Sequence, residues 1–200
     1  MRTPKFISAI VEVPNTRLPV LAALLLAALA VALLAGSALA ASNLVKNGSF
    51  EKDSDGDGIP NNWLGNNLTP ADKRVCKQSY DGSCSFKMTG DGTVKFLYQD
   101  VYSTPGGIGE SYKLTFYMKG KAINQGGFDL FRVQFVILHE DGNSFDSLEQ
   151  VVPQGNSPWA KYSINLTSTE VYEGVRVRIF QEGGPSGKLW IDKINVKEIP

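Results

Sequence analysis

The sequence contains only one histidine, His139, and only two cysteines, Cys76 and Cys84. A single histidine excludes metal sites that need several imidazole ligands, and it restricts histidine-dependent catalysis to one position within a strand-like run. An excess of charge of either sign is also lacking, because 20 basic and 20 acidic side chains balance. The composition therefore gives no sign of the basic surface that nucleic acids require, and we expect no nucleic-acid partner.

The first forty residues have the character of an export signal. A mildly basic head leads into the apolar run "LPVLAALLLAALAVALLAG", and Ala38-Leu39-Ala40 has the small-x-small form that signal peptidase accepts. We predict a signal peptide over residues 1–40 and a secreted or cell-surface protein. The alternative is an uncleaved anchor, since the apolar run approaches the thickness of a bilayer, and only this alternative implies a membrane. Cleavage would leave 17 basic and 19 acidic side chains.

The two cysteines stand close together in "CKQSYDGSC", separated by a Tyr-Asp-Gly-Ser turn. A zinc or redox site would need more ligands or a tighter spacing. In an oxidising compartment, Cys76 and Cys84 are therefore predicted to form a disulfide that closes a hairpin.

From residue 43 onward, short alternating runs rich in Val, Ile, Phe and Tyr are separated by clusters of Gly, Asn, Asp and Pro. This spacing predicts one all-β domain over residues 41–200, an antiparallel β-sandwich of jelly-roll topology. The runs interpreted as strands are residues 43–51, 84–90, 94–102, 111–120, 130–140, 147–153, 159–167, 175–182 and 188–198.

Period-2 alternation assigns the two faces of each predicted strand. The predicted core sets are Tyr112, Leu114, Phe116 and Met118; Phe131, Val133, Phe135 and Ile137; Val175, Val177 and Ile179; and Val94, Phe96 and Tyr98. If the strands are neighbours in one sheet, the opposite face combines Tyr117, Arg132, Gln134, Arg176, Arg178 and Gln99.

A face of arginines, amides and an aromatic ring suits a polyhydroxylated ligand. Amides and guanidinium groups meet hydroxyls in fixed directions, and an aromatic ring stacks on the apolar face of a pyranose. We therefore predict contacts to polysaccharide or glycan from Tyr117, Arg132, Gln134, Arg176 and Arg178, with Trp159 as a further loop aromatic. The alternative is an ordinary solvent-facing side of a half-buried sheet.

The opening "NLVKNGSFEKDSDGDGIPNNW", the middle "SYKLTFYMKG" and the ending "KLWIDKINVKE" resemble the jelly-roll carbohydrate-binding modules of families 4, 9 and 22 and their galactose-binding-like relatives. The resemblance covers the chain after residue 40, in the right order. It implies a structural calcium ion (Ca2+) between the first and last strands, with Glu51 and Asp192 as ligands and backbone carbonyls from residues 81–83, around Gly82. The alternative is that Glu51 and Asp192 are solvated acids at strand ends.

The run "DSDGDG" offers a competing calcium site. Asp53, Asp55 and Asp57 alternate as in an EF-hand loop, but the twelfth position is Leu64 rather than the bidentate glutamate that such a loop requires. A polar surface turn is the other interpretation. Trp63, which closes the stretch, is predicted to anchor the chain in the core or at its rim.

The jelly-roll glycosidases that resemble laminarinases and lichenases carry a Glu-x-Asp-x-x-Glu strand, and this string is missing here. His139, Glu140 and Asp141 gather at a predicted turn, which is an ordinary composition for a hairpin connection. We therefore predict a noncatalytic carbohydrate-binding module. The alternative is a structural or adhesive cell-surface domain that binds protein partners and no sugar.

Overall fold

The computed structural model describes residues 42–101, 105–125, 127, 130–142 and 145–200. The predicted signal peptide, residues 1–40, lies outside these residues. Within them, no helix is long and apolar enough to span a membrane. The strands are β1 (Leu64–Asn66), β2 (Lys73–Val75), β3 (Ser85–Asp91), β4 (Lys95–Val101), β5 (Ser111–Asn124), β6 (Phe131–His139), β7 (Phe145–Val151), β8 (Gly155–Thr167), β9 (Tyr172–Gln181) and β10 (Ser186–Ile199).

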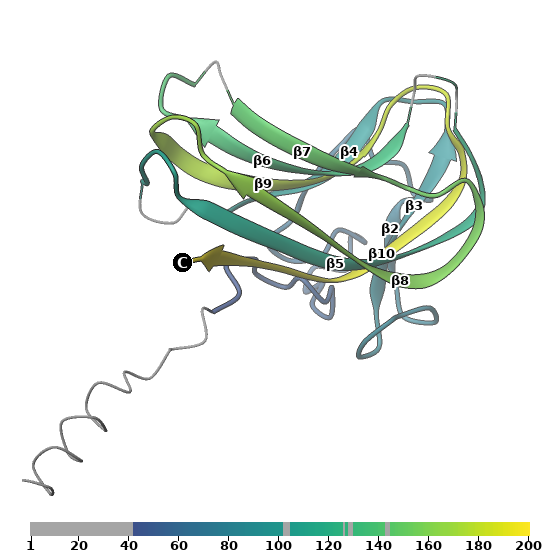
Figure 1. Cartoon of the computed structure of the whole chain (residues 1–200). Helices are drawn as coiled ribbons and strands as arrows, with labels where there is room; N and C mark the ends of the chain where they lie inside the picture. Colours follow the sequence, from purple (N-terminus) through teal and green to yellow (C-terminus); the bar gives the residue numbers. More distant parts are fainter. Residues whose placement is uncertain (1–41, 102–104, 126, 128–129, 143–144) are drawn as a thin grey trace, which may run out of the picture. The chain divides into compact units, whose positions relative to one another are not determined.

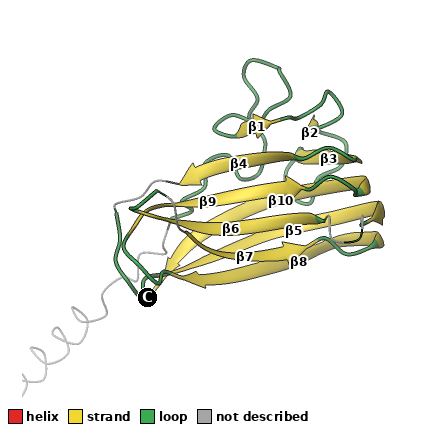
Figure 2. Ribbon diagram, turned by 90° about the horizontal axis from the view of Figure 1, so that it is seen from above, coloured by secondary structure: helices red, strands yellow, loops and turns green. Residues whose placement is uncertain are grey.

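The strands form two antiparallel five-stranded sheets that pack face to face (Figures 1 and 2). Sheet A has the order β1-β4-β9-β6-β7, and sheet B has the order β2-β3-β10-β5-β8. In Figure 1, β9 bows toward sheet B, so the outer face of sheet A is concave. The predicted all-β jelly-roll sandwich is confirmed.

Where apolar residues occupy every second position of a strand, one face of that strand is apolar and packs into the core. On β5, β6 and β9 the predicted core sets are confirmed, because their inward side chains are buried while the intervening residues are at least partly exposed in most cases. The predicted anchor Trp63 is also confirmed, since it is buried against Phe50 with ring centroids 5.2 Å apart. Such aromatic pairs contribute large apolar area as well as ring–ring attraction.

Strand β4 contradicts its predicted faces. Lys95, Leu97, Gln99 and Val101 point inward and are buried, whereas Phe96 and Tyr98 are partly exposed on the outer face of sheet A. The inward polar groups are compensated: the Lys95 ammonium lies 2.7 Å from Asp72 Oδ2 and 2.8 Å from Asp91 Oδ2. A lysine can face the core here because two carboxylates from neighbouring segments offset its loss of hydration.

Residues 43–51, predicted as the first strand, form turns and irregular structure instead. Asn47 and Phe50 have positive φ angles of 51° and 56°, and the Phe50 N–H donates to the Asn47 carbonyl. The segment still touches β10, through hydrogen bonds from Leu44 N to Val196 O and from Ile194 N to Gly48 O. The Asn-Gly turn signal outweighs the strand pattern, because Asn tolerates a left-handed backbone.

The predicted disulfide is confirmed, since Cys76 and Cys84 are bonded in the loop that joins β2 to β3. The two short strands β1 and β2 were not predicted. Each has only three residues, which is too short to display a period.

Candidate glycan-binding site

A set of aromatic and guanidinium side chains covers the outer, concave face of sheet A. The register brings them into adjacent rows: Tyr98 is opposite Arg178, and Arg178 is opposite Gln134, while Phe96 is opposite Phe180, and Phe180 is opposite Arg132. We call this set the sheet-A platform: Phe96, Tyr98, Phe180, Arg132, Gln134, Arg176 and Arg178.

The guanidinium groups of the platform lie over its aromatic rings. The distances from Arg Cζ to the ring centroid are 4.9 Å for Arg176 over Tyr98, 4.8 Å for Arg178 over Phe180 and 5.5 Å for Arg178 over Phe96. Arg132 lies 5.3 Å from the centroid of Phe180. Cation–π attraction holds these flat groups together, so the rings and hydrogen-bond donors are presented in a defined arrangement.

Acidic neighbours neutralise two of the three arginines. Arg176 pairs with Asp100, and Arg132 pairs with Glu149 and Glu182. Burial opposes ionisation of Arg132, but the hydrogen bonds and charges of its two carboxylate partners outweigh it and raise the pKa of this guanidinium. The platform therefore offers directed hydrogen-bonding groups without a strong net charge.

Arg178 differs from the other two arginines. Within the part of the chain that the structure describes, its Nε and Nη2 atoms donate to Gln134 Oε1, and it forms no ion pair. Burial lowers the pKa of Arg178, and the neighbouring charges of Arg176 and Arg132 lower it further. A polar ligand that accepts a hydrogen bond from this central guanidinium would relieve part of that desolvation cost.

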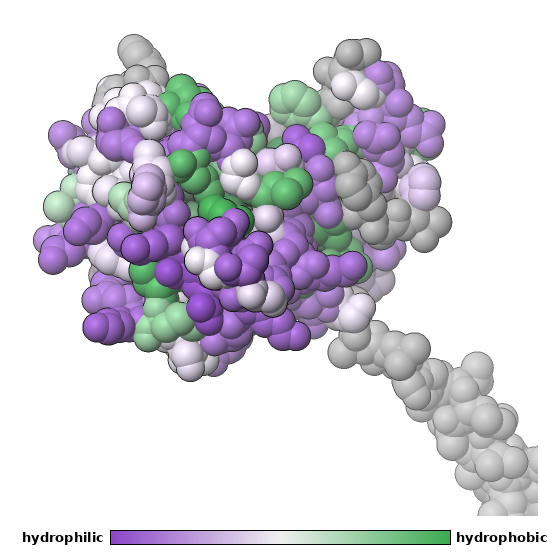
Figure 3. All heavy atoms as spheres, turned by 180° about the vertical axis from the view of Figure 1, so that it is seen from behind, coloured by the Kyte–Doolittle hydropathy of each residue, from purple (hydrophilic) through white to green (hydrophobic). Residues whose placement is uncertain are grey.

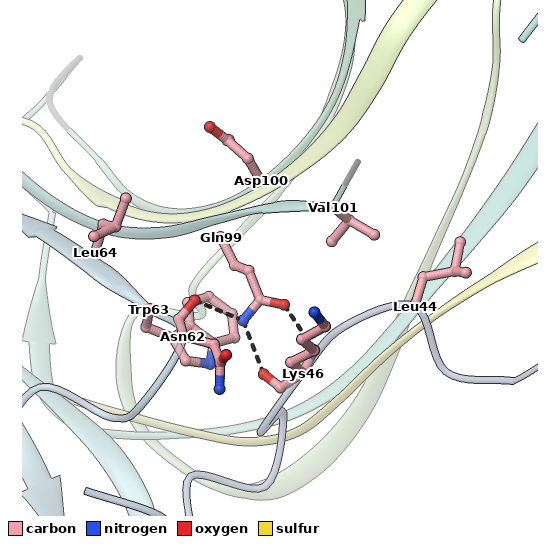
Figure 4. Close-up of a pocket in the computed structure, with 8 residues that line it drawn as sticks. All are labelled: Leu44, Lys46, Asn62, Trp63, Leu64, Gln99, Asp100 and Val101. Atoms are coloured by element: carbon pink, nitrogen blue, oxygen red, sulfur yellow. Dashed lines mark hydrogen bonds between the residues drawn. The ribbon is translucent and has the colours of Figure 1, made fainter. Parts of the chain in front are cut away.

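A pocket of about 440 Å³ adjoins the platform beside β1 and β4 (Figure 4). Its lining includes Leu64 and Asp100, and register places Leu64 opposite Tyr98 of the platform. Below them, Gln99 receives a hydrogen bond from Lys46 N and donates to the carbonyls of Lys46 and Asn62. Gln99 therefore ties the N-terminal segment to β4, and the prediction that it shares a face with the arginines is wrong.

The predicted ligand contacts divide between the two sheets. Arg132, Gln134, Arg176 and Arg178 come together as expected, whereas Tyr117 lies on β5 of sheet B and Trp159 on β8 of the same sheet. The prediction that Tyr117 shares a face with the arginines is wrong. Its ring stacks on Tyr80 with centroids 3.6 Å apart, and Trp159 lies 6.2 Å from Tyr80. Alternation fixes the faces of a single strand, but it does not reveal which strands pair.

The sequence interpretation missed Phe96 and Tyr98 as surface residues because it assigned them to the core. The predicted contacts also lacked Phe180, Asp100 and Glu149. In "RVRIF", Phe180 follows Arg176 and Arg178 at alternate positions, and this period-2 spacing is a signal that could have found it.

The three segments implied as calcium ligands do converge. Glu51 Oε1 accepts hydrogen bonds from the backbone N–H groups of Ser83 and Cys84, at 2.8 and 3.0 Å. Asp192 is fully buried and accepts from Tyr80 N and Asp81 N, at 2.8 and 3.0 Å. Burial raises the pKa of Asp192, and the charge of Glu51 adds to the rise while the backbone donors oppose it.

Glu51 and Asp192 fit a hard cation in charge, because two carboxylates face the same loop. The loop, however, turns backbone N–H groups toward them, and the Gly82 carbonyl accepts a hydrogen bond from the Ser79 hydroxyl at 3.1 Å. A Cβ atom added to Gly82 would collide with Glu51 Oε1, so the loop and the carboxylate are in close contact. Glu51 Oε2 has no hydrogen-bond partner among the described residues. Oxygen atoms from separate segments are the donors that calcium prefers. In the competing turn, carboxylate oxygens of Asp53, Asp55 and Asp57 lie within 4.8 Å of one another.

His139 is buried at the end of β6, where its Nε2 lies 2.9 Å from Asp146 Oδ2 and its Nδ1 lies 3.7 Å from Glu170 Oε2. Asp146 also accepts hydrogen bonds from the backbone N–H and the hydroxyl of Thr169. This network connects the β6–β7 hairpin to the β8–β9 loop. It is far better suited to holding loops together than to meeting a substrate, because the imidazole is almost entirely covered.

No family model matches the chain, and no curated protein matches it. Among solved structures, a family 16 carbohydrate-binding module is 18% identical, with a TM-score of 0.55, over 77% of this chain and 99% of that chain. A family 61 module in complex with β-1,4-galactotriose is 18% identical, with a TM-score of 0.55, over 78% and 99%. The xylan-binding family 22 module of Paenibacillus barcinonensis is 14% identical, with a TM-score of 0.56, over 80% and 96%.

These likenesses confirm the predicted resemblance at the level of the fold. The chain has the jelly-roll fold of carbohydrate-binding modules, and its described residues match nearly the whole length of these three single-domain structures. Identities this low carry no information about which ligand this chain binds.

Proposed function

We propose that this protein is a secreted, noncatalytic carbohydrate-binding module that holds polysaccharide or glycan on the sheet-A platform. The observation that carries the proposal is the aromatic and guanidinium array on the concave face of sheet A. The resemblance in fold to carbohydrate-binding modules supports it.

The chemistry of binding follows from the platform. The partly exposed ring of Tyr98 offers an apolar face on which the C–H groups of a pyranose stack. Arg178 and Gln134 donate to ring hydroxyls in fixed directions, and the carboxylates of Asp100 and Glu149 accept from them. The bound sugar is held and not cleaved in this proposal, because the acids nearest the platform are engaged by arginines.

The test is affinity electrophoresis in gels that contain soluble neutral glucans, xylans, mannans or galactans. We expect at least one polysaccharide to retard the protein, and Tyr98→Ala and Arg178→Ala each to weaken that retardation about tenfold. Thermal unfolding of each variant shows that the fold is retained.

Tyr117→Ala provides the discriminating comparison, because it removes a similar ring from the opposite sheet. Loss of retardation by Tyr117→Ala but not by Tyr98→Ala would assign the sugar to sheet B and refute the platform. If no glycan retards the parent protein, the alternative of a structural or adhesive surface domain takes the place of this proposal.

We also propose that calcium binds where Glu51, Asp192 and the loop around Gly82 converge, and that it joins the N-terminal segment to β10. In the bound state Glu51 and Asp192 would supply charge and the loop would supply oxygen atoms. Saturating calcium should raise the melting temperature relative to chelator, since a ligand of the folded state stabilises it. Asp192→Asn should abolish the difference in melting temperature between calcium and chelator. If only Asp55→Asn abolishes it, the calcium site is the acidic turn instead.

A further inference from the structure

Lysines gather on the outer face of sheet B, opposite the platform. They lie on four neighbouring strands, and register sets Lys113 opposite Lys197 and Lys121 opposite Lys188. Trp190 lies between Lys87 and Lys119 in another row. We call this set the lysine face: Lys87, Lys113, Lys119, Lys121, Lys161, Lys188, Lys193 and Lys197.

The acidic groups beside the lysine face are buried or paired. Asp192, which is opposite Tyr117 in the register, is buried and accepts hydrogen bonds from Tyr80 N and Asp81 N. Among the described residues, the only ion pair there joins Lys193 Nζ to Asp81 Oδ2 at 3.0 Å, with both side chains about half exposed. Burial lowers the pKa of Lys87, and the charges of Lys73 and Lys188 lower it further, which reflects this crowding of like charges. Eight of the 17 basic side chains that follow residue 40 lie on this face, so it is positively charged although the chain is neutral overall.

A pocket of about 440 Å³ opens on the lysine face, at β5, β8 and β10. Three ammonium groups line it together with hydroxyl, amide and aromatic side chains: Lys161, Lys193, Lys197, Thr115, Asn195 and Tyr117. Lys161 and Lys197 are exposed and have no ion-pair partner in the described part of the chain. The stacked rings of Tyr80 and Tyr117 form one edge of this region, and Tyr80 is 44% exposed.

We propose that the lysine face is a second binding surface, and that it takes a polysaccharide bearing carboxylate groups. A uronic-acid residue presents one carboxylate and several hydroxyls on a single ring. The pocket presents the matching set, with ammonium groups for the carboxylate, Thr115 and Asn195 for hydroxyls, and aromatic rings for the apolar face of the sugar.

The composition of the face favours an acidic sugar over nucleic acid. Arginine, whose planar fork meets phosphate through two hydrogen bonds, is not found on this face among the described residues. Arg132, Arg176 and Arg178 belong to the platform, and Arg74 donates to the carbonyls of Phe50 and Glu51. Lysine ammonium groups are point charges that a carboxylate meets equally well from several directions.

The edge of the sandwich beside this face is mostly polar. Figure 3 shows this edge from behind, where hydrophilic residues predominate and hydrophobic ones form small patches between them. Because the two binding faces point in opposite directions, one domain could hold a neutral and an acidic polysaccharide at the same time.

The experiment is affinity electrophoresis of the whole protein in gels that contain polygalacturonate. At about 50 mM salt we expect retardation, which should vanish at about ten times that concentration as the charges are screened. Lys161→Glu should weaken binding about threefold, and Lys161→Glu with Lys197→Glu about tenfold. Lys52→Glu is the matched control, because it makes the same change in net charge at an exposed lysine outside the face.

Two outcomes overturn the proposal directly: the parent protein is not retarded, or Lys161→Glu and Lys52→Glu weaken the retardation equally. Tighter binding of dextran sulfate or of a single-stranded oligonucleotide than of polygalacturonate would assign the face to a different polyanion. Loss of polygalacturonate binding in Tyr98→Ala would place the acidic chain on the platform. Binding of neutral glycan is measured separately, so failure of one surface leaves the other testable.

Discussion

Asp72→Ala should be strongly destabilising, because it removes a buried charge on which a buried lysine depends. Asp72 is 2% exposed and accepts four hydrogen bonds. Its Oδ2 atom receives the Thr69 backbone N–H at 2.9 Å, the Thr69 hydroxyl at 2.8 Å and the Lys95 ammonium at 2.7 Å. Its Oδ1 atom receives the Thr89 N–H at 2.7 Å.

The expected loss in free energy of unfolding follows from the contacts that remain around Lys95 after Asp72→Ala. The Lys95 ammonium would remain fully buried with only Asp91 as a partner, and the Asp91 side chain is 31% exposed. Removal of one partner from a buried pair costs about 3–5 kcal/mol in free energy of unfolding. Asp72→Asn keeps the shape and some of the acceptors but loses the charge, so we expect a cost of about 2 kcal/mol.

The assay is urea unfolding followed by tryptophan fluorescence and by circular dichroism, whose agreement tests two-state behaviour. Asp72→Ala should lower the midpoint by about 2 M without changing the slope. The control is Asp81→Ala, which removes the exposed pair with Lys193 and should leave the unfolding midpoint close to that of the parent. A loss below about 1 kcal/mol for Asp72→Ala, or an equal loss for Asp81→Ala, would refute the reasoning.

Three further results are expected. Partial burial opposes ionisation of Asp91, but hydrogen bonds from Lys95 and Thr93 lower its pKa to about 2. The stabilisation of the fold by ionised Asp91 is complete above the ordinary pKa of this carboxyl, about 3.8, and is lost as the pH falls through about 2. Unfolding titrations of Asp91→Asn should therefore show a flatter stability profile in this window. Gly187→Ala should destabilise the fold by at least about 1 kcal/mol in the same urea assay, because φ is +102° and an added Cβ meets the Ala122 carbonyl. Parent-like stability of this variant would contradict the account. Conversion of Cys76 and Cys84 to serine should cost about 2–3 kcal/mol in free energy of unfolding relative to the oxidised parent, whereas the reduced parent should be about as stable as the variant.

Some parts of the fold were predictable from the sequence. On β5, β6 and β9 one face is apolar at every inward position, so alternation alone identifies the buried set. The disulfide was predictable because only two cysteines exist and they flank a short turn. Strand β4 was misjudged because both of its faces mix polar and apolar residues, and only contacts with Asp72 and Asp91 reveal that Lys95 faces inward.

The sequence by itself determined an all-β sandwich, the inward faces of its most regular strands and the types of residue available to bind a sugar. The tertiary structure alone decided which strands are neighbours. Alternation describes a single strand, whereas pairing such as β4 with β9 and β5 with β10 joins residues far apart in the chain. This pairing separates Tyr117 from Arg178, brings Tyr98 beside Arg178, and concentrates the lysines on the opposite face.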